Sequence, residues 1–144
     1  MNSNDKERIT VKAAIHAPIE TVWEKWTSAD HIVNWNFASD DWCCPSATSP
    51  LEVGARYTSR MEARDGSVGF DFWGTYVVIE PPVRIHTQLG DGRHVEVEFM
   101  SDGKLTQVTE TFDPEDQNPI DLQRGGWQAI LNNFKKYVEN GEMN

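Results

Sequence analysis

Residues 118–141 have the sequence NPIDLQRGGWQAILNNFKKYVENG, and this stretch predicts one long helix. Asn118 suits the capping position and Pro119 suits the first helical position. Asn140 with Gly141 suits the end of the helix. Apolar residues recur at intervals of three and four, which places them on one side of the helix. These residues are Ile120, Trp127, Ile130, Leu131, Phe134, Tyr137 and Val138.

Two glycines, Gly125 and Gly126, lie inside the predicted helix. Each glycine costs about 1 kcal/mol relative to alanine, unless a neighbouring group needs the space or the helix bends there. We therefore expect something large to press on the helix near Trp127.

The composition suits one folded domain over residues 1–144, with an ordered core at 8–140. The formal net charge of −10, without a cluster of Lys or Arg, disfavours nucleic acid and anionic membranes as partners. The first residues, Met1 to Glu7, are polar and contain no apolar signal core, and no stretch is long and apolar enough to span a membrane. We expect a cytoplasmic protein.

Upstream of the helix, the pattern predicts strands. Residues 8–16 alternate between apolar and polar side chains, and Pro18 and Ser28 then begin two short helices. Residues 36–52 hold no period and predict a lid-like loop. Five further strands are separated by Asp-Gly turns and a Pro-Pro step, at 56–63, 69–80, 83–89, 93–101 and 104–112. The predicted fold is α+β, a curved antiparallel six-stranded sheet that grips the long C-terminal helix.

Alternation also predicts which side chains face the helix. The inner set contains Val95, Val97 and Phe99, and also Tyr57, Ser59, Met61, Ile85, Thr87 and Leu89, whereas His94, Glu96 and Glu98 face water. Residues 69–80 do not fit this scheme, since apolar side chains compete for both faces. Both faces of that strand are then covered, by the lid or by a second subunit.

The order of elements resembles the helix-grip fold of the START/SRPBCC superfamily, the birch-pollen-allergen-like group. Local stretches are similar to the branch named after the activator of the heat-shock-protein ATPase, over about Arg8 to Asn140. They are ITVKAAIHAPIETVWEKWTSADHIVNW (9–35), GTYVVIEPPVRI (74–85), VEVEF (95–99), LTQVTETF (105–112) and GWQAILNNFKKYVE (126–139). MEARDGSVGFDF (61–72) and DGR (91–93) resemble a bacterial subset whose members mostly lack an assigned activity.

The resemblance implies a cavity between the sheet and the final helix, used across the superfamily for lipids, sterols, polyketides and other apolar small molecules. A few relatives are cyclases, aromatases or hydratases. Eukaryotic co-chaperone relatives act in the stress response, but carry a second domain that we do not expect in this chain. The candidate cavity residues are Trp35, Trp42, Met61, Trp73, Tyr76, Val97, Phe99, Glu110, Trp127, Ile130, Leu131 and Phe134. The aromatic stripe is equally consistent with a solid core.

No motif of strong chemical specificity is present: the chain has no nucleotide-binding loop, no metalloprotease motif and no nucleophile elbow. Cys43 and Cys44 are adjacent, which suits reduced structural cysteines better than a disulfide. The four histidines are scattered, so we expect no metal site and no cofactor.

Two carboxylates allow alternatives. Glu110 lies on the predicted inner side of its strand, where burial would raise its pKa and make it an acid, a base or a ligand anchor. A strand near its end also twists a glutamate into water, which is the interpretation we favour from the sequence. Asp71, beside Trp73, has the same two interpretations.

Three functions from different classes follow. The favoured one is a non-catalytic module that binds an apolar or aromatic small molecule under the lid. The second is a cyclase-like or hydratase-like enzyme with Glu110 or Asp71 as general base. The third is a protein that binds a partner, such as a chaperone, through an exposed aromatic surface on residues 70–76, or forms a homodimer through the same strand.

Overall fold

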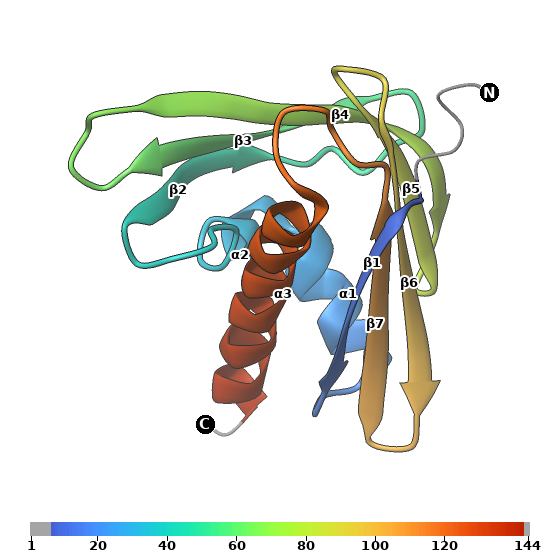
Figure 1. The fold of residues 1–144 in the computed structure, drawn as a ribbon. Helices are drawn as coiled ribbons and strands as arrows, with labels where there is room; N and C mark the ends of the chain where they lie inside the picture. The colour runs from blue at the N-terminus through green and yellow to red at the C-terminus, as the bar shows by residue number, and fades with distance from the viewer. Residues whose placement is uncertain (1–6, 143–144) are drawn as a thin grey trace.

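The computed structural model describes residues 7–142. Within this range the chain forms three helices and seven strands (Figure 1). The strands make one antiparallel sheet of order β1-β7-β6-β5-β4-β3-β2. The elements are β1 (Ile9–Ile15), α1 (Ile19–Thr27), α2 (Ala29–Ile32), β2 (Trp42–Thr48), β3 (Arg56–Ala63), β4 (Gly69–Glu80), β5 (Arg84–Leu89), β6 (His94–Asp102), β7 (Leu105–Phe112) and α3 (Ile120–Glu142).

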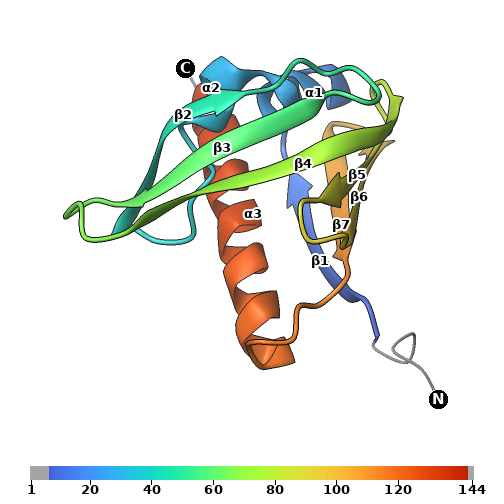
Figure 2. The same ribbon diagram turned by 90° about the horizontal axis from the view of Figure 1, so that it is seen from above.

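The sheet curls around α3. In Figure 1, β1, β7 and β6 run beside the helix, whereas β2, β3 and β4 arch across its N-terminal part; Figure 2 shows this arch from above. The helices α1 and α2 pack against each other, as predicted, and close one end of the space inside the curl. None of the helices between residues 7 and 142 has both the length and the apolarity needed to cross a membrane.

The predicted alternation is confirmed on the strands beside α3. Val95, Val97 and Phe99 are at most 5% exposed, while Glu98 between them is exposed. The outer face carries polar pairs, including Glu96, which accepts hydrogen bonds from two arginines. The register puts each inner residue of β6 beside an inner residue of β7, which gives an inner face that is apolar except at Glu110, the partner of Val97.

A bulge in β4 explains why its sequence fits neither face. Pairing with β5 shifts between Tyr76 and Val78, so one extra residue is inserted there. Before the bulge, Phe72 and Tyr76 face the interior, and after it Ile79 packs against the core. Trp73 lies on the opposite, outer face.

The prediction of a lid over residues 36–52 is wrong in its central part. Trp42–Thr48 forms β2, which pairs with β3 at the edge of the sheet and makes the sheet seven-stranded rather than six-stranded. Pro45 lies within this strand, and the pairing shifts between Cys43 and Ser46. An edge strand tolerates a proline and a bulge, but both erase the alternation by which a strand is recognised in a sequence.

The predicted ends of the long helix need two corrections. Asn118 does not cap it, because its side chain donates to Glu115 Oε2 (2.8 Å). The amides of Leu122 and Gln123 donate instead to the Pro119 carbonyl (3.1 Å each). The helix also continues through residues 140 and 141 to Glu142 instead of stopping there.

Candidate functional site

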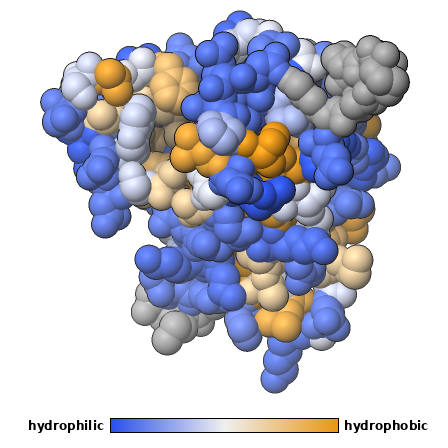
Figure 3. Space-filling model, viewed as in Figure 1, coloured by the Kyte–Doolittle hydropathy of each residue, from blue (hydrophilic) through white to orange (hydrophobic). Residues whose placement is uncertain are grey.

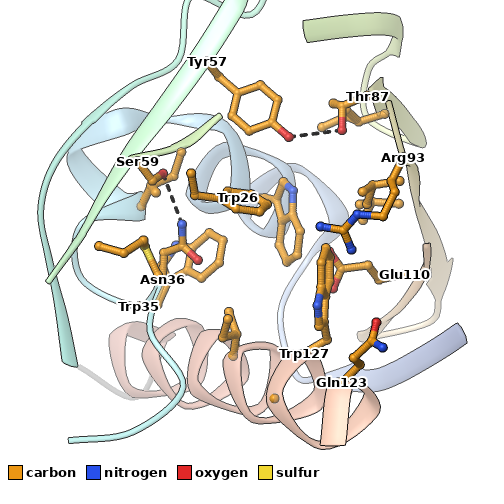
Figure 4. Close-up of a pocket in the computed structure, with 18 of the residues that line it drawn as sticks. Trp26, Trp35, Asn36, Tyr57, Ser59, Thr87, Arg93, Glu110, Gln123 and Trp127 are labelled. Atoms are coloured by element: carbon orange, nitrogen blue, oxygen red, sulfur yellow. Dashed lines mark hydrogen bonds between the residues drawn. The ribbon is translucent and has the colours of Figure 1, made fainter. Parts of the chain in front are cut away.

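A cavity of about 410 Å³ lies between the inner face of the sheet and α3 (Figure 4). Its volume falls within the range of small-molecule sites, about 300–1,000 Å³. The wall is mostly aromatic and aliphatic. Its aromatic residues are Trp26, Trp35, Tyr57, Phe70, Phe72, Tyr76 and Trp127.

The mouth of the cavity adjoins the N-terminal part of α3. Leu122 lines the cavity and is 62% exposed, and the neighbouring Ile120 is 41% exposed. Figure 3 shows apolar residues gathered over this part of an otherwise largely hydrophilic face. An apolar molecule that enters the cavity here would pass over exposed apolar side chains.

The helix side of the cavity is set by Gly126 and Trp127. The indole of Trp127 stacks on Phe112, with ring centroids 3.8 Å apart and an angle of 13° between the planes. A Cβ atom added to Gly126 or Gly125 would meet nothing within 4 Å. The expectation of a large group pressing on the helix here is thus wrong. Gly126 lines the cavity, so the missing side chain leaves open space.

The opposite end of the cavity is closed by stacked tryptophans. Trp26 on α1 stacks on Trp35 at 4.9 Å, and both rings meet the edge of Phe134. The Trp35 indole donates to the Lys25 carbonyl (2.9 Å), which fixes its ring. The stacked rings fill this end of the wall, and Asn36 and Ser59, joined by a hydrogen bond of 3.1 Å, lie beside them in Figure 4.

Glu110 is the buried carboxyl of the wall. Its side chain comes from β7 and is 8% exposed, and its backbone lies between Val11 of β1 and Val97 of β6. Burial raises its pKa to about 8, so the free carboxyl is mostly protonated at neutral pH. The expectation that the strand end turns Glu110 into water is wrong, because β7 pairs on both sides as far as Phe112.

The cavity wall also carries polar side chains besides Glu110. In Figure 4 the Arg93 guanidinium extends toward Glu110 and Trp127. Its Nε donates to Asp91 Oδ2 (2.8 Å). The Tyr57 hydroxyl lies 3.1 Å from Thr87 Oγ1, and burial raises the Tyr57 pKa to about 12.

The structure places seven of the twelve sequence-predicted residues on the cavity wall: Trp35, Met61, Tyr76, Val97, Glu110, Trp127 and Ile130. Phe99, Leu131 and Phe134 are instead buried in the solid core behind it. They share faces with wall residues, but lie toward α1, whose tryptophans contact Phe99 and Phe134.

Two predicted cavity residues lie elsewhere. Trp73 is on the outer face, where the Arg56 guanidinium lies 3.7 Å from its ring centroid. Its neighbours Phe72 and Gly74 point inward, and the bulge that changes the face of the strand comes only after Tyr76. Trp42, on edge strand β2, does not line the cavity, although its ring contacts the half-exposed Phe70, which does. Trp42 belongs to the segment expected to be a lid over the cavity, and this segment forms an edge strand instead.

Several wall residues are absent from the set predicted from the sequence. Tyr57 and Thr87 were assigned to the inner face but not to the site. Trp26 had the helical spacing of an inward residue. Arg93 follows an Asp-Gly turn, and no local pattern indicates that its side chain reaches the cavity.

The remaining chemical candidates do not form a second site. Asp71 is exposed and lies 3.4 Å from the Arg60 guanidinium, so it is not a buried base. Cys43 and Cys44 are both free thiols. No group of three or more metal-ligating side chains occurs in the described part of the chain.

Residues 16–139 match the family described as "Activator of Hsp90 ATPase homolog 1-like protein". The solution structure of the AHSA1-like protein from Aeromonas hydrophila is similar at 43% identity over 96% of both chains, with a TM-score of 0.90. Chr148 from Cytophaga hutchinsonii shares 44% identity over 95% of both chains, with a TM-score of 0.80. NE0264 from Nitrosomonas europaea, at 13% identity and a TM-score of 0.82, shows the fold alone. No curated protein matches the chain.

Proposed function

The chain belongs to the activator of Hsp90 ATPase homolog 1-like family, and we propose that it is a non-catalytic binding module for a small hydrophobic or aromatic molecule. The molecule would occupy the cavity between the sheet and α3.

The observation that supports this proposal is a cavity of about 410 Å³, which is lined mostly by apolar side chains and is not filled by them. A void with apolar walls forfeits contacts, so leaving it empty costs stability. A two-ring aromatic molecule that buries roughly 250 Å² at about 25 cal/mol per Å² gains about 6 kcal/mol before the costs of association. A gain of about 6 kcal/mol corresponds to a Kd of about 40 μM before those costs, so this area alone supports at best binding between tens of micromolar and millimolar.

Native mass spectrometry tests the proposal. Freshly purified protein is compared with its denatured mass, then mixed with a panel of fatty acids, sterols and polycyclic aromatics. We expect an adduct that disappears on denaturation. Gly126→Leu should abolish it, because the new side chain enters the cavity where no atom lies within 4 Å.

Gly125→Leu is the matched control. The two glycines are adjacent in α3 and equally uncrowded, but Gly125 is exposed and does not line the cavity. Gly125→Leu should keep the adduct. If both variants bind like the wild type, or if nothing binds to any of them, the cavity is not a binding site.

A second candidate, acid–base catalysis in the same cavity, is favoured by Glu110 alone. A buried carboxyl with a pKa of about 8 can exchange protons near neutral pH. Turnover of a bound molecule that Glu110→Gln abolishes, while binding of that molecule persists, would support the enzyme over the binding module.

A further inference from the structure

Glu110 differs from the other polar side chains of the cavity wall. Among the described residues it has no hydrogen-bond or ion-pair partner, although 92% of its surface is buried. The remaining hydroxyl, amide and charged side chains of the wall each have at least one hydrogen bond. They are Thr27, Asn36, Tyr57, Ser59, Tyr76, Thr87, Arg93, Glu115, Asn118 and Gln123.

The ionised form of this carboxyl is disfavoured in the empty protein, because burial raises its pKa to about 8. No fully buried side-chain oxygen of the described residues lacks a partner, so the Glu110 oxygens keep accessible surface on the cavity, where a ligand can reach them. The strand neighbours of Glu110 on the same face, Val108 and Phe112, are fully buried apolar residues, and a third apolar residue would fit the pattern. A partner supplied by a ligand explains why a carboxyl occupies the site.

One aromatic ring of the wall lies beside the carboxyl, and a second feels its charge. Trp127 lies beside Glu110 in Figure 4 and is held flat against Phe112. Tyr57 is close enough to be influenced by the charge of Glu110, which contributes to its raised pKa. Aromatic faces attract cations through their quadrupole, most strongly when water is excluded. A carboxyl with such faces near it is suited to an organic ammonium ion.

The other charges around the cavity are one guanidinium, that of Arg93, which extends toward Glu110 in Figure 4, and carboxylates that offset it. Arg93 on the wall is compensated by Asp91, and its Nη1 donates to the Asp113 carbonyl (3.4 Å). Glu115, at the polar end, adds a negative charge, and the phenols of Tyr57 and Tyr76 have raised pKa values and stay neutral. The net charge of −10 also favours the approach of cations over anions.

We infer that the cavity selects a lipophilic organic amine, an aromatic or aliphatic body with one ammonium group, and that Glu110 is its counter-ion. The inference rests on the proposed function, because it requires that the cavity binds small molecules. At neutral pH the empty site holds a proton on Glu110, so the arriving ammonium forms its ion pair as this proton leaves to solvent. One proton is released for each amine bound.

Three probes with one common body test the inference by isothermal titration calorimetry at pH 7. They are 1-(aminomethyl)naphthalene, 1-naphthalenemethanol and 1-naphthoic acid. We expect the amine to bind about tenfold or more tightly than the alcohol, and the acid to bind more weakly than the alcohol. Titrations in buffers of different ionisation enthalpy should show the release of one proton with the amine.

Glu110→Gln keeps the size of the side chain and removes its charge. It should weaken amine binding about tenfold or more, abolish proton release, and leave alcohol binding within about twofold. Glu98→Gln, on the outer face of the neighbouring strand, is the matched control and should behave like the wild type.

Each other outcome has one meaning. Equal binding of amine and alcohol, or amine binding unchanged in Glu110→Gln, would overturn the inference and leave the proposed binding module standing. Tightest binding of the acid would overturn it in favour of Arg93 as the selecting group. Binding of none of the three probes would remove the proposed function as well.

Discussion

Replacing Glu110 with glutamine should stabilise the ligand-free protein, by an amount that grows with pH. Burial raises the pKa of this carboxyl from 4.5 to about 8. Between these two values the folded state holds a proton that the unfolded state has released. The free energy of unfolding contributed by Glu110 is therefore highest at pH 4.5 and below, falls as the pH rises to about 8, and then levels off.

The magnitude follows from the two pKa values. One pKa unit corresponds to about 1.4 kcal/mol, so a carboxyl with these values loses about 3 kcal/mol of stability between pH 5.5 and pH 8. Glutamine has no proton to lose in this range. The stability of the wild type, measured relative to Glu110→Gln, should therefore fall by about 3 kcal/mol over the same interval.

Urea unfolding followed by tryptophan fluorescence at four pH values between 5.5 and 8 measures this difference. His86, whose pKa burial lowers, titrates in the same range with the opposite effect on stability, and its contribution cancels when the two proteins are compared. Glu98→Gln should track the wild type. If the free energy of unfolding changes with pH in the same way for the wild type and Glu110→Gln, the placement of Glu110 as a buried carboxyl without a partner is refuted.

Three further substitutions test separate parts of the account. Trp127→Ala should cost about 3 kcal/mol in urea unfolding, because the stack on Phe112 is lost; unchanged stability would contradict the packing of α3. Trp73→Ala should leave binding of 1-naphthalenemethanol unchanged in calorimetry, since Trp73 lies against Arg56 on the outer face; weakened binding would contradict that orientation. Thr106→Val should lower the free energy of thermal unfolding by about 1–3 kcal/mol, because the buried Ala17 carbonyl loses the Thr106 hydroxyl that donates to it at 2.8 Å. Unchanged stability would mean that this carbonyl finds another donor.

The parts of the fold that follow from periodicity could be predicted from the sequence. The apolar spacing of α3 and the alternation of β6 each repeat over several turns or residue pairs, so single exceptions do not hide the pattern. These two elements also fix the inner face, which is why residues such as Val97 and Trp127 were correctly assigned to the side of the sheet or helix that faces the cavity.

The parts that depend on irregularities could not be predicted. One bulge shifts the face of β4 after Tyr76, and another, beside Pro45, breaks up β2, so neither strand shows a simple period. The burial of Glu110 depends on strand pairing with β1, almost a hundred residues away in sequence. The open space at Gly126 depends on which residues the fold brings opposite to it, and no local pattern encodes this.

The tryptophans give the most direct test of the central claim, that the cavity binds a small apolar or aromatic molecule. The chain has six of them, and each indole N–H gives its own signal in a proton–nitrogen correlation spectrum. During a titration with 1-naphthalenemethanol, we expect saturable shifts for Trp26, Trp35 and Trp127 on the wall, and none for Trp42 and Trp73 outside it. Shifts confined to Trp42 and Trp73, or no saturable shift at any indole, would contradict the claim.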